Sequence, residues 1–124
     1  KVDYNFQLEI TDLFVHERLF EQACANLFDN ACKYSTNDVV LTVTSKKVGD
    51  SIVITVGDNG PGISSQHLGR IFERFYRVDH SRESKRGTGL GLSIVKHIIN
   101  KHKGTIKVES SDKGTTFTIT LPAP

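Results

Sequence analysis

The sequence predicts an α+β fold, a two-layer sandwich in which three helices cover one face of a mixed, mostly antiparallel sheet. Several segments alternate apolar and polar residues, which is typical of strands that bury only one face. Other segments repeat apolar residues every three or four positions, as amphipathic helices do. The chain has 124 residues, of which 37% are hydrophobic. This is enough apolar material for one core, so we expect a single domain over residues 1–124.

The first half of the chain predicts a strand, a long helix and a hairpin. Residues 6–10 alternate as a strand does. Residues 16–34 predict a helix whose core-facing stripe is formed by Phe20, Ala23, Leu27 and Ala31. Residues 39–48 and 51–57 predict two strands, joined at the turn pair Gly49-Asp50 into a hairpin.

The second half predicts two helices and two strands. The serine pair at 64–65 offers N-caps for a short helix that carries Leu68, Ile71, Phe72 and Phe75. Residues 77–86 hold one aliphatic side chain among charges, so we expect a mobile loop there, with Phe72 and Phe75 as its anchors. Helical periodicity returns over residues 90–102, and residues 105–109 and 116–121 close the chain as strands.

Composition excludes several classes of protein. The net charge is +2 and charges of both signs are mixed, which argues against a nucleic-acid-binding surface. No run of 18 apolar residues and no signal peptide occurs, so we expect no membrane contact by this segment. Cys24 and Cys32 lie about 12 Å apart along the predicted helix, beyond disulfide reach. They indicate a reducing, cytoplasmic compartment, and the first residue, Lys1, indicates a domain cut from a longer protein.

Three polar residues on the first helix form the most informative pattern. Asn26, Asn30 and Lys33 are spaced by four and three residues, which puts their side chains within roughly a 60° arc. The arc borders the apolar stripe, so these side chains can face a crevice. Amide oxygens suit a hard cation and an ammonium suits phosphate, so the pattern is compatible with magnesium-bound polyphosphate. A polar helix edge with only local hydrogen bonds would give the same pattern.

Two glycine-containing segments add a second and a third binding element. The turn Asp58-Asn-Gly60-Pro-Gly62 follows a strand, and its two glycines let the backbone approach a flat ligand closely. The carboxylate of Asp58 suits an exocyclic amine such as that of adenine. Gly87-Thr-Gly89-Leu-Gly91-Leu opens a helix, whose free N–H groups suit an anion. It is neither a Walker A loop nor a Rossmann fingerprint, because the glycine spacing and the preceding segment differ. Each segment alone is also compatible with an ordinary turn or helix start.

Together these motifs resemble the catalytic and ATP-binding domain of bacterial sensor histidine kinases, in the gyrase, chaperone, kinase and mismatch-repair (GHKL, Bergerat fold) superfamily. Residues 26–34 resemble the N box, 58–62 the G1 box, 72–77 the F box and 87–92 the G2 box. The phrases Phe-Tyr-Arg-Val-Asp and Gly-Thr-Gly-Leu-Gly-Leu-Ser-Ile-Val-Lys look most like the phosphate-responsive and cell-wall sensor kinases. One departure is Arg86, where many relatives carry a further glycine.

The resemblance implies ATP and Mg²⁺ as ligands. Asn30 would ligate the metal, and Asn26, Lys33 and Arg77 would act with it at the phosphates. Asp58 would bind the adenine amine. The nucleotide-contacting residues implied in addition are Tyr34, Gly60, Gly62, Ile63, Tyr76, Gly87, Thr88, Gly89, Leu90, Gly91 and Leu92.

The resemblance also implies phosphotransfer to a histidine on a separate helical dimerisation domain. Related ATPases carry a glutamate as general base where this chain has Asn26, and an amide is not a useful base near neutral pH. No histidine here lies in the acceptor motif, because Glu21 replaces the proline after the similar segment at His16. We therefore expect the acceptor domain upstream, in a membrane-bound homodimeric parent that signals to a response regulator. The alternatives are an ATP-binding sensory module without phosphotransfer, a serine kinase of the same superfamily and a free ATPase.

Overall fold

The computed structural model describes residues 2–9, 15–33, 38–76 and 91–123, which form a five-stranded sheet and three helices. The strand order is β1-β2-β3-β5-β4. β1 (Val2–Leu8) runs parallel to β2 (Val39–Val48), and all other pairings are antiparallel. The remaining strands are β3 (Ser51–Asp58), β4 (Thr105–Ser111) and β5 (Gly114–Pro122). The prediction of a mixed, mostly antiparallel sheet is confirmed.

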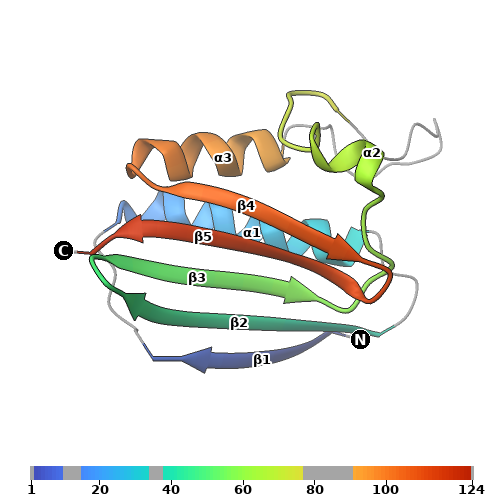
Figure 1. Cartoon of the computed structure of the whole chain (residues 1–124), viewed down its shortest axis with the longest axis horizontal. Coiled ribbons are helices and arrows are strands. Elements are labelled where there is room, and N and C mark those ends of the chain that lie inside the picture. Colours follow the sequence, from blue (N-terminus) through green and yellow to red (C-terminus); the bar gives the residue numbers. More distant parts are fainter. Residues whose placement is uncertain (1, 10–14, 34–37, 77–90, 124) are drawn as a thin grey trace.

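The helices α1 (Glu17–Lys33), α2 (Ser65–Leu68) and α3 (Gly91–Lys101) lie on one face of this sheet (Figure 1). The core forms between the two layers, because strands and helices bury one side each. Its largest fully buried side chains are Phe117, Leu27, Leu41, Ile99, Ile119 and Val95. The predicted stripe of α1 faces this core: Ala23, Leu27 and Ala31 are buried, and Phe20 packs against the buried residues. No described helix is long and apolar enough to cross a bilayer.

Two elements differ from the sequence prediction. The first strand spans Val2–Leu8 rather than residues 6–10, because its position follows from parallel pairing with β2, from Val2↔Val39 to Leu8↔Ser45. The helix α2 ends at Leu68, so the residues after it lie in turns. Phe72 still packs against the core, but Phe75 has a positive φ of 66° and is 65% exposed. The prediction that Phe75 anchors this segment is therefore wrong.

The structure also tests the predicted helix cap and the two cysteines. Ser64 occupies the N-cap position with an extended backbone, but its side chain makes no capping hydrogen bond. Cys24 and Cys32 are both free thiols, as predicted. Ile10, at the end of the predicted first strand, and the predicted mobile loop at 77–86 lie outside the described residues.

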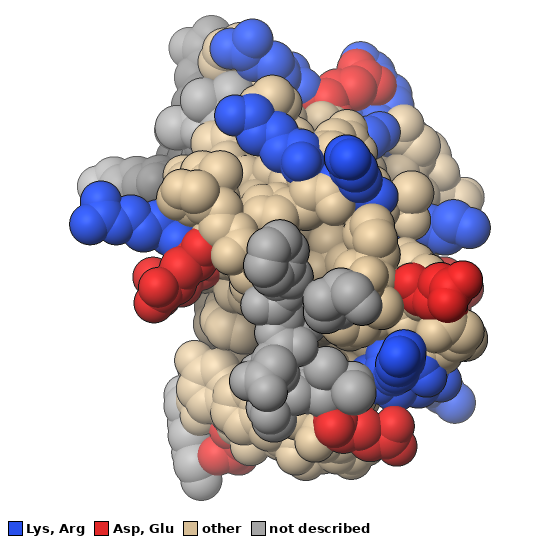
Figure 2. Space-filling view, turned by 90° about the vertical axis from the view of Figure 1, so that its left-hand side faces the viewer, with Lys and Arg blue, Asp and Glu red and all other residues tan. Residues whose placement is uncertain are grey.

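The ends of the elements divide the molecule into two poles. At one pole β3 ends, β4 turns into β5, α1 ends and α3 begins (Figure 1, right). At the other pole α1 begins beside the end of α3, where the backbone N–H of His16 donates to Nε2 of His102 at 2.8 Å. Figure 2 views this second pole, where basic and acidic side chains are interspersed. The described parts of the four predicted motifs belong to the first pole.

Candidate functional site

Asp58 is the last residue of β3, and its carboxylate is fixed by the backbone around it. Oδ1 accepts the N–H of Gly60 at 2.8 Å and the N–H of Thr115, on β5, at 3.3 Å. Burial raises the pKa of this carboxyl, and the two N–H donors offset part of that rise. Among the described residues, no donor binds Oδ2. One oxygen is thus immobilised, and the other remains able to accept a hydrogen bond from a ligand.

The turn after Asp58 packs tightly against the hairpin of β4 and β5. Gly62 has a φ of +84°, and a Cβ there would lie 1.9 Å from the carbonyl oxygen of Ser111. The next residue, Ile63, is buried, and its N–H donates to Oγ of Ser110 at 2.7 Å. The sequence predicted that these glycines let a ligand approach the backbone. In the structure, Gly62 is required because another strand approaches the backbone at that point.

Three residues that the sequence analysis did not single out complete this region. Thr115 is buried and supplies one N–H to Asp58. Ser110 bridges the turn and the hairpin. Asn59 joins the turn to the start of β2, because its Oδ1 accepts the N–H of Val40 at 2.9 Å. Nothing in the sequence indicated that Ser110 and Thr115 belong to the site, since serine and threonine are common in half-exposed strands.

Asn26, on α1, lies next to the start of α3. Asn26 and Asn30 are both half-buried, as expected for residues at the border of the apolar stripe. Nδ2 of Asn26 donates to the carbonyl oxygen of Gly91 at 3.3 Å. Gly91 is the first residue of α3, and the following residue, Leu92, packs against the core. The structure therefore joins the first predicted motif to the helix start of the third.

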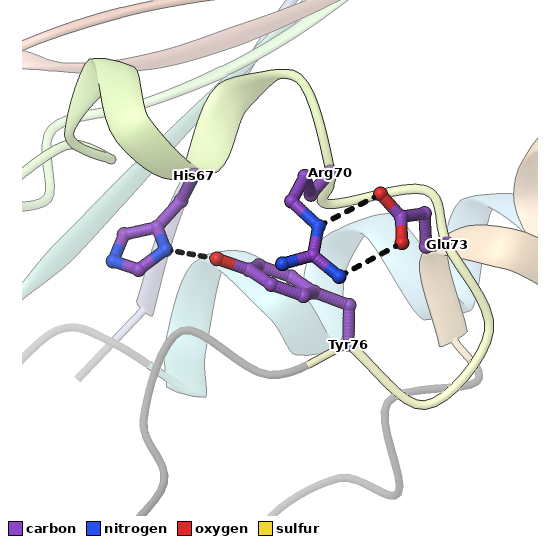
Figure 3. Close-up of polar contacts among 4 residues, drawn as sticks. All are labelled: His67, Arg70, Glu73 and Tyr76. Carbon is purple, nitrogen blue, oxygen red and sulfur yellow. Dashed lines mark hydrogen bonds and ion pairs between the residues drawn. The ribbon is translucent and has the colours of Figure 1, made fainter.

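Tyr76 is held by a cluster of polar side chains from α2 and from the turns after it (Figure 3). Its hydroxyl is hydrogen-bonded to Nδ1 of His67, and the guanidinium of Arg70 lies 4.6 Å from the centre of its ring. Arg70 in turn binds both carboxylate oxygens of Glu73, at 2.9 and 3.1 Å. Tyr76 was predicted to contact the nucleotide. In the structure its side chain packs against His67 and Arg70 and so ties residue 76 to α2 and the turn after it.

The other predicted site residues lie outside the described part of the chain. The backbone of Lys33 ends α1, but its side chain is not described. The same holds for the whole of Tyr34, Arg77, Gly87, Thr88, Gly89 and Leu90. Within the described ranges, no three or more His, Cys, Asp or Glu side chains are grouped so that they could hold a metal ion.

Residues 15–124 match the family described as histidine kinase-, DNA gyrase B-, and HSP90-like ATPase. The chain belongs to this family. Sensor histidine kinase CusS of Escherichia coli K12 is 43% identical over 106 residues, which cover 85% of this chain and 22% of CusS. Sensor-like histidine kinase SenX3 of Mycolicibacterium smegmatis is 44% identical over 108 residues, or 86% of this chain and 28% of SenX3. The chain thus spans roughly a quarter of these relatives' length.

Solved structures agree with this family. The mycobacterial sensor histidine kinase MprB superposes with a TM-score of 0.85 at 30% identity, over 99% of this chain and 85% of that one. Histidine kinase ThkA in complex with response regulator protein TrrA matches with a TM-score of 0.77 at 26% identity, over 99% of this chain and 34% of ThkA. The chain is therefore a catalytic, ATP-binding domain of the sensor histidine kinase type, and both the predicted resemblance and the predicted fold are confirmed.

Proposed function

We propose that this domain binds ATP with Mg²⁺ and transfers the γ-phosphoryl group to a histidine on a helical dimerisation domain outside this chain. The parent protein would be a membrane-bound homodimer that passes the phosphoryl group on to a response regulator. The observation that carries the proposal is the immobilised carboxylate of Asp58, with one oxygen committed to the backbone and one still able to bind a ligand.

The adenine end of the site follows from that carboxylate. An ionised carboxylate only accepts hydrogen bonds, so it suits the 6-amino group of adenine and repels the 6-carbonyl oxygen of guanine. Because Oδ1 is fixed by Gly60 and Thr115, Oδ2 is preorganised and loses little entropy when it binds the amine. Selectivity for ATP over GTP would therefore come from Asp58.

The phosphate end is assigned to α1 and to the start of α3. Asn30 would supply an amide oxygen to Mg²⁺, and Lys33 and Arg77 would supply cations to phosphate oxygens. The contact of Asn26 with Gly91 keeps the first turn of α3 beside α1, and the free N–H groups of a helix start favour anions. The segment 87–92 would contribute further backbone N–H groups.

This chain is proposed to position ATP for transfer, without supplying a general base that would activate water. Mg²⁺ would neutralise charge that builds up on the phosphates in the transition state. Asn26 stands where the related ATPases place a general base, and its amide cannot take a proton from water at neutral pH. The γ-phosphoryl group is thus held for a nucleophile supplied by another domain, and a histidine is the nucleophile used by sensor histidine kinases.

The test uses labelled ATP, Mg²⁺ and this domain, with and without a helical histidine domain from a sensor histidine kinase. We expect label only on the added domain, in an acid-labile form typical of phosphohistidine. Asn30→Ala and Asn30→Asp should abolish the transfer and leave the unfolding transition unchanged. Asn100→Ala, an exposed asparagine near the end of α3, is the matched control and should transfer normally.

Other outcomes would identify a different function. Acid-stable label would indicate a serine kinase of the same superfamily. Binding of ATP without any transfer would indicate a sensory module, and steady release of phosphate without an acceptor would indicate an ATPase. Strong labelling of this domain on its own histidines would contradict the proposal directly.

A further inference from the structure

We infer that Ser110 is a positioning residue for nucleotide selectivity. Its hydroxyl holds the turn 58–62 against the hairpin of β4 and β5, and thereby keeps Asp58 in place for the adenine amine. This inference rests on the proposed function, because it takes Asp58 as the group that binds the base. Ser110 itself need not touch the nucleotide.

The hydroxyl of Ser110 has three neighbours from three places in the sequence. Oγ accepts the N–H of Ile63 at 2.7 Å, which fixes the far end of the turn. It donates to the carbonyl oxygen of Gly114 at 3.2 Å, and it lies 2.8 Å from Oγ1 of Thr115. A hydroxyl has one proton to donate and two lone pairs to accept with. Since the proton is used on Gly114, Thr115 is the donor of the third bond, and the capacity of Ser110 is fully used.

These bonds act on Asp58 through Thr115. The N–H of Thr115 donates to Oδ1 of Asp58, at the near end of the same turn. The turn is therefore fastened to the hairpin at both ends, by Thr115 at Asp58 and by Ser110 at Ile63. If the far end is released, the hairpin and the turn can separate, and the orientation of the carboxylate is no longer fixed.

A comparison of two nucleotides separates this role from a general structural one. Purine riboside triphosphate is ATP without the 6-amino group, so it makes no contact with Asp58 that could be lost. The variants are Ser110→Ala and its matched control Ser111→Ala. Among the described residues, the hydroxyl of Ser111 accepts only the N–H of Lys113 in the hairpin turn, at 3.1 Å. The dissociation constant of each nucleotide is measured calorimetrically for the wild type and both variants, with Mg²⁺ present.

We expect the wild type to bind ATP about 10-fold more tightly than purine riboside triphosphate, the effect of one charge-assisted hydrogen bond. Ser110→Ala should weaken ATP binding about 5-fold and change the binding of the analogue less than about 2-fold, so that the discrimination falls to about 2-fold. Ser111→Ala should keep the wild-type ratio. If Ser110→Ala is unfolded, Ser110→Cys replaces it, because a thiol is similar in size and a weak acceptor.

Each result decides the question. An unchanged ratio, with or without an equal loss for both nucleotides, overturns the inference. A wild type that does not distinguish the two nucleotides overturns the proposed role of Asp58 instead. A ratio that falls only in the variants of Ser110 supports the inference.

Discussion

Gly62→Ala tests how closely the turn 58–62 must approach the hairpin of β4 and β5. A Cβ at residue 62 would lie 1.9 Å from the carbonyl oxygen of Ser111 and 2.8 Å from its carbonyl carbon. Both are backbone atoms, so no side-chain rotation can relieve the clash. The gap between Cβ and oxygen must open to the 3.4 Å of ordinary contact, and the whole turn must move away from β4.

The magnitude follows from a matched glycine. Gly49, in the turn between β2 and β3, has a φ of +60° and open space around its Cβ position. Gly49→Ala should therefore destabilise the fold by only the left-handed backbone term, about 1–2 kcal/mol. Gly62→Ala carries the same term and in addition breaks the bond between Ile63 and Ser110, so we expect a total of about 2–5 kcal/mol.

Urea unfolding and calorimetry with ATP measure the two effects. Gly62→Ala should unfold at much lower urea and bind ATP at least about 10-fold more weakly, the equivalent of one lost charge-assisted bond at Asp58. Gly49→Ala should bind ATP normally. Equal losses of stability in the two variants, or normal ATP binding by a folded Gly62→Ala, would refute the reasoning.

Three further predictions address other contacts. Asp58→Asn should weaken ATP binding about 10-fold at neutral pH. Because burial raises the pKa of Asp58 in the folded state, ATP affinity should fall on acidification through that raised pKa in the wild type more than in the variant, as followed by titrations at several pH values. Asn26→Asp cannot donate to Gly91 and should lower ATP affinity about 5-fold in the same assay. His102→Ala removes the acceptor for His16, and urea unfolding should show a loss of about 1 kcal/mol with normal ATP binding.

The raised pKa of Asp58 also has a consequence for stability. The folded state binds this proton more tightly than the unfolded chain does, so the stability that the group contributes is present in acid and is lost as pH rises through the raised pKa. At neutral pH the ionised carboxylate therefore weakens the fold. Asp58→Asn should bind ATP poorly and yet be at least as resistant to urea as the wild type, a combination that a merely structural aspartate would not give.

Local patterns in the sequence predicted the elements that depend on local interactions. β2 was predicted at its observed bounds because it alternates and ends at the turn pair Gly49-Asp50. The burial of Ala23, Leu27 and Ala31 followed from helical periodicity alone. β1 was misplaced because its register is set by a parallel neighbour more than thirty residues away, which alternation cannot identify.

In the candidate site, too, local features were predicted and long-range contacts were missed. Asp58 and Asn26 were predicted from residue type, spacing and resemblance. Ser110 and Thr115 were missed because the contacts that make them important join residues 47 and 57 positions apart. Phe75 was predicted to lie on the short helix and to anchor the following loop because apolar periodicity runs on past Leu68. The helix ends at Leu68 and Phe75 has a positive φ, and periodicity contains no information about either change.

Asn26 contributes to the proposed function in two ways. From the sequence, its importance is the absence of a base, since an amide cannot activate water. In the structure, Asn26 is a hydrogen-bond donor, because its Nδ2 donates to the carbonyl oxygen of Gly91. An ionised glutamate could supply the base but could not donate to that carbonyl. An asparagine at this position therefore favours both halves of the proposed activity, a site that does not hydrolyse ATP and a phosphate-binding helix that is fixed against α1.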